Sequence, residues 1–151
     1  MTATQQATTS VTLTRFIKAP RRKVYDAWLR PEVLKQWMGG PTTLVPVFES
    51  DARVGGKYHL EMQSVPADGS TGKRYLVDGT YQEMVPGEKL VFTWISATPV
   101  TGDSLVTVLF RDKDGGTEMT FTHERFASPE AAEQHRKGWT SSFEKLAALL
   151  Q

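Results

Sequence analysis

The sequence contains no cysteine, so neither a disulfide framework nor thiolate chemistry is available to this protein. That absence fits a protein that stays inside the cell, and we expect a cytoplasmic location. The chain also lacks an excess of charge of one sign, because its 18 Lys and Arg residues nearly balance its 17 Asp and Glu residues and leave a net charge of only +1. Since no long basic run is present, nucleic acid and anionic membranes are not favoured as partners.

The beginning of the chain lacks the features of a targeting or membrane segment. Residues 1–10 (MTATQQATTS) are polar, with neither a basic start nor an apolar stretch, so they form neither a secretory signal nor a membrane span. We expect residues 1–10 to be a disordered tail. Residues 11–151 are expected to form one domain, since this length fits a single hydrophobic core.

Recognisable catalytic motifs are missing as well. The sequence has no G-x-S-x-G elbow, no dinucleotide-binding fingerprint and no H-E-x-x-H motif. Residues 69–73 (GSTGK) lack the spacing of a phosphate loop and precede no helical pattern, so we interpret them as a hairpin tip. His59, His123 and His135 are too far apart in the sequence to form a local metal site. We therefore expect neither a metal nor a cofactor.

What the sequence does contain is a long amphipathic helix at its C-terminal end, over residues 128–151. Ser128 suits the N-cap and Pro129 suits the first helical position. Apolar residues then recur at steps of three and four, which places on one helix face Ala132, His135, Trp139, Phe143, Leu146 and Leu150. This face must cover an apolar surface, and the preceding segments supply a sheet.

Gly138 interrupts the predicted helix, where glycine costs about 1 kcal/mol relative to alanine. One interpretation is a close approach of another backbone or a tolerated defect. The other is a slight bend over a cavity. We favour the first interpretation, because a single glycine indicates no particular geometry.

The segments before this helix alternate between strand and helix patterns. A strand is predicted over residues 11–18, and two short helices led by proline are predicted over residues 21–29 and 31–38. Alternating apolar residues and turn residues then predict strands over residues 44–50, 57–63, 74–85, 89–96, 105–111 and 117–125, with a β-bulge at Gly79. Consecutive strands with short turns predict an antiparallel sheet, so the fold class is α+β.

Several motifs occur together, in the order in which one known family has them. They are AP...V..AW at residues 19–28, W.G at residues 37–39, D.R.GG at residues 51–56, G.Y.E..P.EKLVFTW at residues 79–94, DGGT..T.TH..F at residues 114–126 and H..GW...F..L...L at residues 135–150. This combination resembles the family named after the activator of the ATPase of a large heat-shock chaperone. The resemblance is to its C-terminal-domain-like members within the START-like, or SRPBCC, superfamily.

The resemblance covers nearly the whole chain after the tail and implies the helix-grip fold, which the birch-pollen allergen also has. In this fold a curved antiparallel sheet of about six to seven strands wraps around a long C-terminal helix, with two short helices after the first strand. An apolar cavity between sheet and helix often admits a hydrophobic small molecule. Met38 stands where the family often has a second aromatic residue, so we expect the cavity wall to differ there.

Inward-facing side chains of the strands and helices are the candidate ligand-binding residues, namely Trp37, Tyr58, Met62, Tyr81, Trp94, Phe110, Phe121, His123, His135, Trp139 and Phe143. For the aromatic residues the alternative is plain hydrophobic core. His123 and His135 have two main interpretations. Each is either a polar group that holds the helix to the sheet, which we prefer, or a polar contact that orients an apolar ligand. Acid–base catalysis by either histidine is the weakest of the three interpretations.

The function we expect is binding of a hydrophobic small molecule in a cavity between the sheet and the C-terminal helix. One alternative is a co-chaperone that stimulates an ATPase, as the family name suggests. Such activators carry an additional N-terminal domain that we do not expect here, and the near-zero net charge offers no docking field. The other alternative is a cyclase- or hydrolase-like enzyme that uses the same cavity. Several relatives form dimers, so a homodimer is one further expectation from the resemblance.

Overall fold

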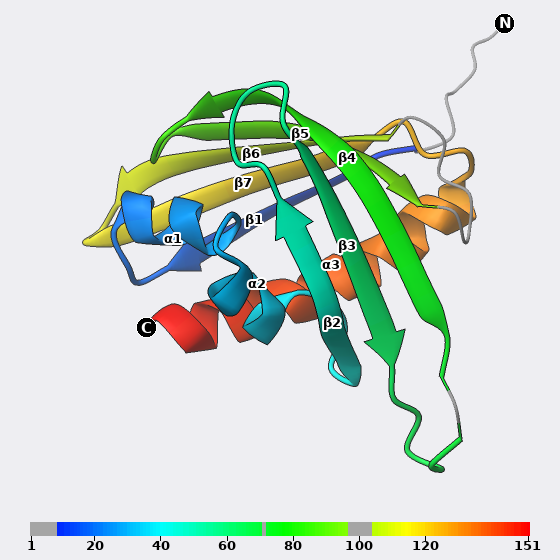
Figure 1. Ribbon diagram of the computed structural model, residues 1–151. Helices are drawn as coiled ribbons and strands as arrows, with labels where there is room; N and C mark the ends of the chain where they lie inside the picture. Colours follow the sequence, from blue (N-terminus) through cyan, green and yellow to red (C-terminus); the bar gives the residue numbers. More distant parts are fainter. Residues whose placement is uncertain (1–8, 71, 97–103) are drawn as a thin grey trace, which may run out of the picture.

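The computed structural model describes residues 9–70, 72–96 and 104–151, and its architecture is α+β (Figure 1). Most of the predicted tail, residues 1–10, therefore lies outside the described residues. The elements follow one another in the order β1 (Val11–Ile17), α1 (Arg21–Ala27), α2 (Pro31–Trp37), β2 (Thr43–Ser50), β3 (Lys57–Ser64), β4 (Arg74–Val85), β5 (Lys89–Ser96), β6 (Ser104–Lys113), β7 (Gly116–Glu124) and α3 (Pro129–Leu150). The predicted succession of a strand, two short helices, further strands and a long helix is confirmed.

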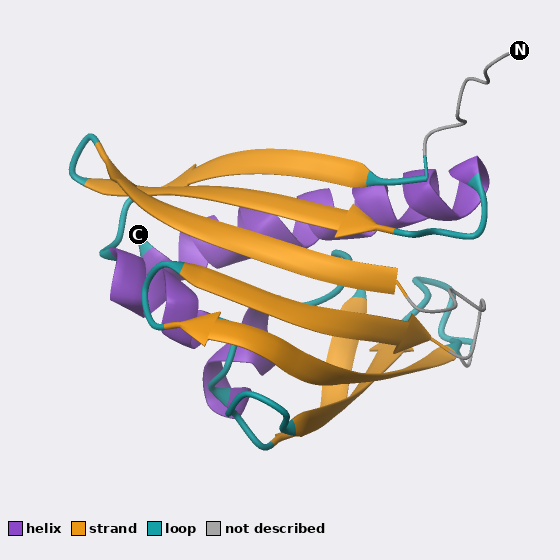
Figure 2. Cartoon of the chain, turned by 90° about the horizontal axis from the view of Figure 1, so that it is seen from above, coloured by secondary structure: helices purple, strands orange, loops and turns teal. Residues whose placement is uncertain are grey.

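The seven strands form one sheet in the order β1-β7-β6-β5-β4-β3-β2, and every pair is antiparallel. Short connections make β2 to β7 neighbours in sequence order, whereas β1 pairs with the last strand. The sheet curls over α3, and the two short helices lie near the C-terminal end of α3 (Figures 1 and 2). This is the predicted helix-grip fold. None of the described helices is long and apolar enough to cross a membrane.

Helix α3 begins and faces the sheet as the sequence predicts. The Ser128 side chain accepts a hydrogen bond from the Ala131 backbone N–H at 3.1 Å, which satisfies one of the unpaired donors of the first turn. The apolar face is buried at Trp139, Phe143 and Leu146. It packs against β1 and α2, so these contacts hold the helix within the curl of the sheet.

Aromatic rings fill the space between α3, the short helices and the sheet. Phe121 of β7 contacts Trp139 and Phe143 of α3, with ring centroids 4.6 and 5.0 Å apart. Trp28 and Trp37, from the segment that contains α1 and α2, join this cluster with their own ring centroids 4.9 Å apart. Because burial of one Phe-sized side chain stabilises a fold by about 1.5–3 kcal/mol, this aromatic cluster is a large part of the core.

A chain of hydrogen bonds crosses the core through His123. The Trp139 indole N–H donates to Nδ1 of His123 at 3.1 Å, and Nε2 of His123 lies 3.0 Å from the Ser104 hydroxyl. Because an indole N–H can only donate, Nδ1 is the acceptor and Nε2 carries the proton. The Ser104 hydroxyl donates in turn to the carbonyl oxygen of Trp94. These bonds tie α3 to β7, β6 and β5, in agreement with the preferred interpretation of His123 as a link between helix and sheet.

Gly79 is not the β-bulge that the sequence predicts. The pairing of β4 with β5 keeps its register past Gly79 and shifts between Tyr81 and Glu83. Gly79 instead makes room for its neighbours, because a Cβ atom there would lie 2.1 Å from the Thr93 carbonyl oxygen and 2.3 Å from the ring of Tyr58. The inward alternation of β4 therefore runs unbroken through this glycine.

We expect Gly79→Ala to lower the free energy of unfolding by about 2–3 kcal/mol, since the added methyl group must displace backbone or a packed ring. Unfolding in urea measures this change. Gly138→Ala is the matched control, because it adds the same methyl group within α3 where no described atom outside the helix backbone lies within 4 Å. The control should gain up to about 1 kcal/mol. Equal stability of Gly79→Ala and the wild type would contradict the close contact.

The buried position of His123 makes the stability of the fold depend on pH. Burial, and to a smaller extent His135, lowers the pKa of His123 to about 2. In the unfolded chain the same imidazole titrates near pH 6.5, so below about pH 6.5 the unfolded state takes up a proton that the native state does not. Native stability from this residue is therefore complete above about pH 6.5 and decreases by about 1.4 kcal/mol per pH unit as the pH falls further.

We expect His123→Leu to cost about 1–3 kcal/mol at neutral pH, because it leaves the Trp139 indole N–H and the Ser104 hydroxyl without His123. The difference in stability between wild type and variant should then shrink by about 1.4 kcal/mol per pH unit below about pH 6.5, so that it vanishes or changes sign by about pH 4. Urea unfolding of both proteins over this pH range gives the comparison. His135 remains in both proteins, so its titration cancels to first order. Parallel pH curves for the two proteins would contradict the low pKa of His123.

Candidate functional site

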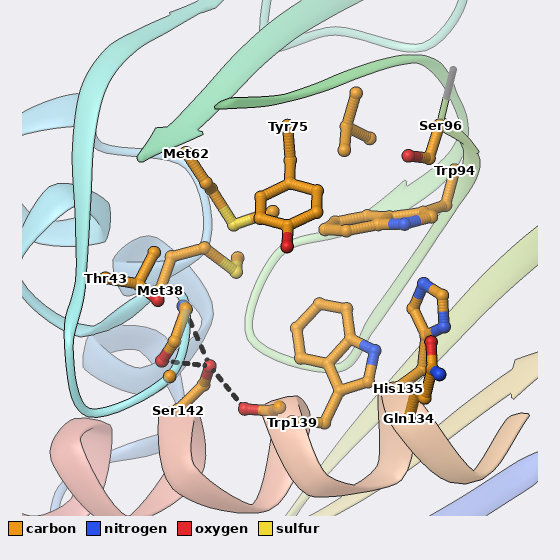
Figure 3. Close-up of a pocket in the computed structure, with 14 residues that line it drawn as sticks. Met38, Thr43, Met62, Tyr75, Trp94, Ser96, Gln134, His135, Trp139 and Ser142 are labelled. Carbon is orange, nitrogen blue, oxygen red and sulfur yellow. Dashed lines mark hydrogen bonds between the residues drawn. The ribbon is translucent and has the colours of Figure 1, made fainter. Parts of the chain in front are cut away.

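A pocket lies between α3 and strands β3, β4 and β5 (Figure 3). Since α3 packs on β1 and α2, it leaves space where the curled sheet turns away from it. The volume of the pocket is about 320 Å³, at the small end of the range for small-molecule sites. The residues that line it are Met38, Gly39, Gly40, Thr43, Met62, Tyr75, Val77, Trp94, Ser96, Gln134, His135, Gly138, Trp139 and Ser142.

The strand side of the pocket is mainly apolar because inward positions of neighbouring strands meet there. Met62 of β3 lies directly opposite Tyr75 of β4. The indole of Trp94 on β5 contacts that of Trp139 on α3, with ring centroids 5.0 Å apart and the planes inclined by 58°. Figure 3 shows these side chains around the same space. The pocket thus offers several flat or flexible apolar surfaces to a ligand.

The connection between α2 and β2 forms the opposite rim, and polar contacts hold it on α3. The Ser142 hydroxyl lies 2.9 Å from both the N–H and the carbonyl oxygen of Gly39, as the dashed lines in Figure 3 show. The ammonium group of Lys145 donates to the carbonyl oxygen of Gly40 at 2.9 Å. Gly39 has a φ of 95°, a conformation that glycine adopts without steric cost. The rim therefore has a defined position relative to the helix.

Gly138 faces the pocket from α3. A Cβ atom added there would meet no described atom within 4 Å outside the helix backbone, so the close approach of another backbone is wrong as an explanation. The missing side chain instead leaves part of the pocket open, between His135 and Ser142 in the lining.

His135 is the half-buried polar group of the helix side. Its Nδ1 lies 2.8 Å from the Ala131 carbonyl oxygen, which can only accept, so Nδ1 carries the proton and Nε2 is an acceptor. The imidazole packs on Phe126 and His123, with ring centroids 4.7 and 5.3 Å apart. Burial lowers the pKa of His135, and the hydrogen bond to Ala131 opposes this shift only in part. The imidazole is therefore neutral at physiological pH.

The described residues that line the pocket include no Asp, Glu, Lys or Arg. Its polar side chains are those of Thr43, Tyr75, Ser96, Gln134, His135 and Ser142. Within the part of the chain that the structure describes, no group of three or more His, Asp or Glu side chains is placed to hold a metal ion. An uncharged molecule can enter such a site without leaving a buried charge unpaired.

The predicted ligand-binding residues divide into three groups in the structure. Four of them line the pocket, and these are Met62, Trp94, His135 and Trp139. Two more, Tyr58 and Tyr81, line a second cavity of about 20 Å³ that shares Met38 and Trp94 with the first. The Tyr58 hydroxyl donates to the Thr93 carbonyl oxygen at 2.6 Å, and burial raises the pKa of Tyr81 to about 12.

The remaining five candidates lie in the packed core and outside the pocket lining, and they are Trp37, Phe110, Phe121, His123 and Phe143. This corrects the expected extent of the cavity wall. The physical reason is that aromatic side chains of β7 and α3 contact one another directly, which leaves no space between them. These five residues match the alternative of plain core, with His123 as the polar link.

The third histidine, His59, lies on the other face of the sheet. Its Nε2 is 2.7 Å from a carboxylate oxygen of Glu61, and its Nδ1 is 2.7 Å from one of Asp78. The hydrogen bonds to Glu61 and then Asp78 raise the pKa of His59. Arg74 donates to Glu61 as well, at 2.8 Å. This charged cluster is separate from the residues that line the pocket.

Several residues that line the pocket were not predicted from the sequence, although for some of them the sequence contains a pattern that indicates their position. Tyr75 was overlooked because a bulge was expected at Gly79, whereas unbroken alternation along β4 places Tyr75 on the inner face. Ser142 follows Trp139 by three residues, so a wider helix face would have included it. Thr43 lies at the start of β2 beside a glycine-rich loop, and no periodic pattern pointed to its position.

Comparison with known proteins agrees with this architecture. The family described as Activator of Hsp90 ATPase homolog 1-like protein matches residues 18–151. A crystal structure of a protein from Chromobacterium violaceum is 31% identical in sequence and has a TM-score of 0.83, over 95% of this chain and 98% of that chain. The AHSA1 protein from Silicibacter pomeroyi is 26% identical with a TM-score of 0.74, over 93% of this chain and 96% of that chain.

A solution structure of a protein from Arthrobacter aurescens has the same fold, at 23% identity and a TM-score of 0.76, over 94% of this chain and 86% of that chain. No curated protein matches the sequence. The family match extends from Lys18, directly after β1, to the last residue, and the solved relatives align over nearly their whole length. The chain therefore belongs to the Activator of Hsp90 ATPase homolog 1-like family, whose members have the START-like helix-grip fold.

Proposed function

We propose that this protein binds an uncharged, apolar small molecule in the pocket between α3 and strands β3, β4 and β5. The proposal rests on one observation, an open space of about 320 Å³ that is lined by indole, phenol and thioether side chains. Placing an apolar ligand there removes apolar surface from water on both partners, at about 25 cal/mol per Å². Proteins of this fold generally bind hydrophobic ligands, which agrees with the proposal.

The charge and size of the pocket narrow the class of ligand. A carboxylate or ammonium group would lose its hydration without meeting an opposite charge among the described lining residues. A volume near the lower limit for such sites suits a compact molecule with about two or three rings rather than a long acyl chain. Met38 and Met62 have flexible side chains that adapt to different ring shapes.

We expect the neutral fluorescent probe N-phenylnaphthylamine to bind with an increase in fluorescence and to raise the melting temperature. At a free concentration about one hundred times Kd, the gain in stability is about 2.7 kcal/mol, or roughly 5–10 °C for a domain of this size. Fluorescence titration and thermal unfolding measure the two effects.

The variant Gly138→Leu tests whether the probe binds in this pocket. The new side chain extends from α3 into the pocket and should weaken probe binding at least tenfold without removing any core contact. Lys137→Leu is the matched control, because it adds a leucine at the adjacent exposed position of the same helix. Probe binding that Gly138→Leu leaves unchanged, or no binding by the wild type, would refute the proposal.

A further inference from the structure

The polar groups of the pocket are not equivalent as hydrogen-bonding partners. A tyrosine or serine hydroxyl can both donate and accept, so it does not select one type of ligand group. His135 differs, because its only proton is held on Nδ1 by the Ala131 carbonyl oxygen at 2.8 Å. Nε2 can therefore only accept. No other described residue forms a hydrogen bond with Nε2.

The position of the imidazole directs this acceptor away from its own helix. Nδ1 is hydrogen-bonded to the Ala131 carbonyl oxygen one turn earlier in α3, so Nε2 lies on the side of the ring that faces away from the helix backbone. Contacts with Phe126 and His123 hold the ring in this orientation. His135 and Trp139 are four residues apart on one helix face, and Figure 3 shows both extending from α3 toward the strand side that carries Trp94.

We infer that Nε2 of His135 selects ligands that carry a hydrogen-bond donor on an aromatic ring, such as a phenolic hydroxyl. The inference rests on the proposed function and narrows its ligand to neutral hydroxylated aromatic compounds. The ring of such a ligand lies against the indole of Trp139, and its hydroxyl donates to Nε2 one helical turn away. A ring that lacks a donor displaces water from Nε2 without replacing the hydrogen bond, and this disfavours its binding.

Three related probes test the inference on the intact protein: naphthalene, naphthol and methoxynaphthalene. Methoxynaphthalene keeps the ring and the oxygen of naphthol but has no proton to donate. Near neutral pH the phenol and the imidazole are both uncharged. We expect the wild type to bind naphthol about tenfold more tightly than methoxynaphthalene, which corresponds to one hydrogen bond. Displacement of N-phenylnaphthylamine measures all three affinities.

His135→Phe keeps a planar ring in place and removes the acceptor. In this variant the preference for naphthol should fall to within about twofold, whereas naphthalene should bind about as well as it does to the wild type. Tyr75→Phe is the matched control, because it removes a phenolic hydroxyl from another ring that lines the pocket, and it should keep the tenfold preference. Should His135→Phe fail to fold, His135→Met removes the acceptor with a flexible side chain that adapts to the site.

The outcomes separate this inference from the proposal on which it rests. Equal binding of naphthol and methoxynaphthalene by the wild type overturns the role of His135 but leaves apolar ligand binding intact, provided that naphthalene binds. A preference that persists without His135, or that disappears in Tyr75→Phe, assigns the selection to another group and also overturns the inference. If N-phenylnaphthylamine binds but none of the three probes displaces it, the inference alone is overturned. If N-phenylnaphthylamine itself does not bind to the wild type, the proposed function and the inference both fail.

Discussion

The structure depends on the packing of α3 against the sheet, and the most specific contact in that packing is the hydrogen bond from the Trp139 indole N–H to the His123 imidazole. His123 donates in turn to the Ser104 hydroxyl, and that hydroxyl donates to the Trp94 carbonyl oxygen. One chain of hydrogen bonds therefore joins the helix to three adjacent strands. Each donor in this chain has one acceptor, because the indole and the carbonyl fix the direction at both ends. The helix therefore cannot slide along the aromatic core without breaking polar contacts that are buried and costly to lose.

Helix α3 packs closely against only one side of the curled sheet, and this also explains where the pocket lies. Rings of α3 and β7 meet directly, whereas the sheet curls away toward β3 and β4 and leaves space beneath Tyr75. Trp139 belongs to both regions, with its N–H bonded in the core and its ring in the pocket lining. The charged cluster around His59 lies on the other face of the sheet, so the two faces differ in electrostatic character.

Much of the candidate site followed from periodicity, and the exceptions have definite causes. His135 and Trp139 were identified because they lie on the inward face of a strongly periodic helix. Phe121 and Phe143 have the same inward parity but lie in the core, since parity indicates which side chains face inward and not how far apart the two layers are. Tyr75 was missed for a different reason, because a glycine in a strand signals either a bulge or a close contact, and Gly79 is the second of these.

The sequence by itself determined the order and type of the elements, the face of α3 that is buried and the family to which the chain belongs, because these depend on patterns within short segments. Only the tertiary structure decided which inward side chains touch and which border an open space. That division depends on the distance between α3 and each strand, which residues far apart in the sequence set together. The tautomer of His123 belongs to the same category, since it is fixed by the Trp139 indole that the fold brings to its Nδ1 atom, whereas the tautomer of His135 is fixed within α3 by the Ala131 carbonyl oxygen one turn earlier.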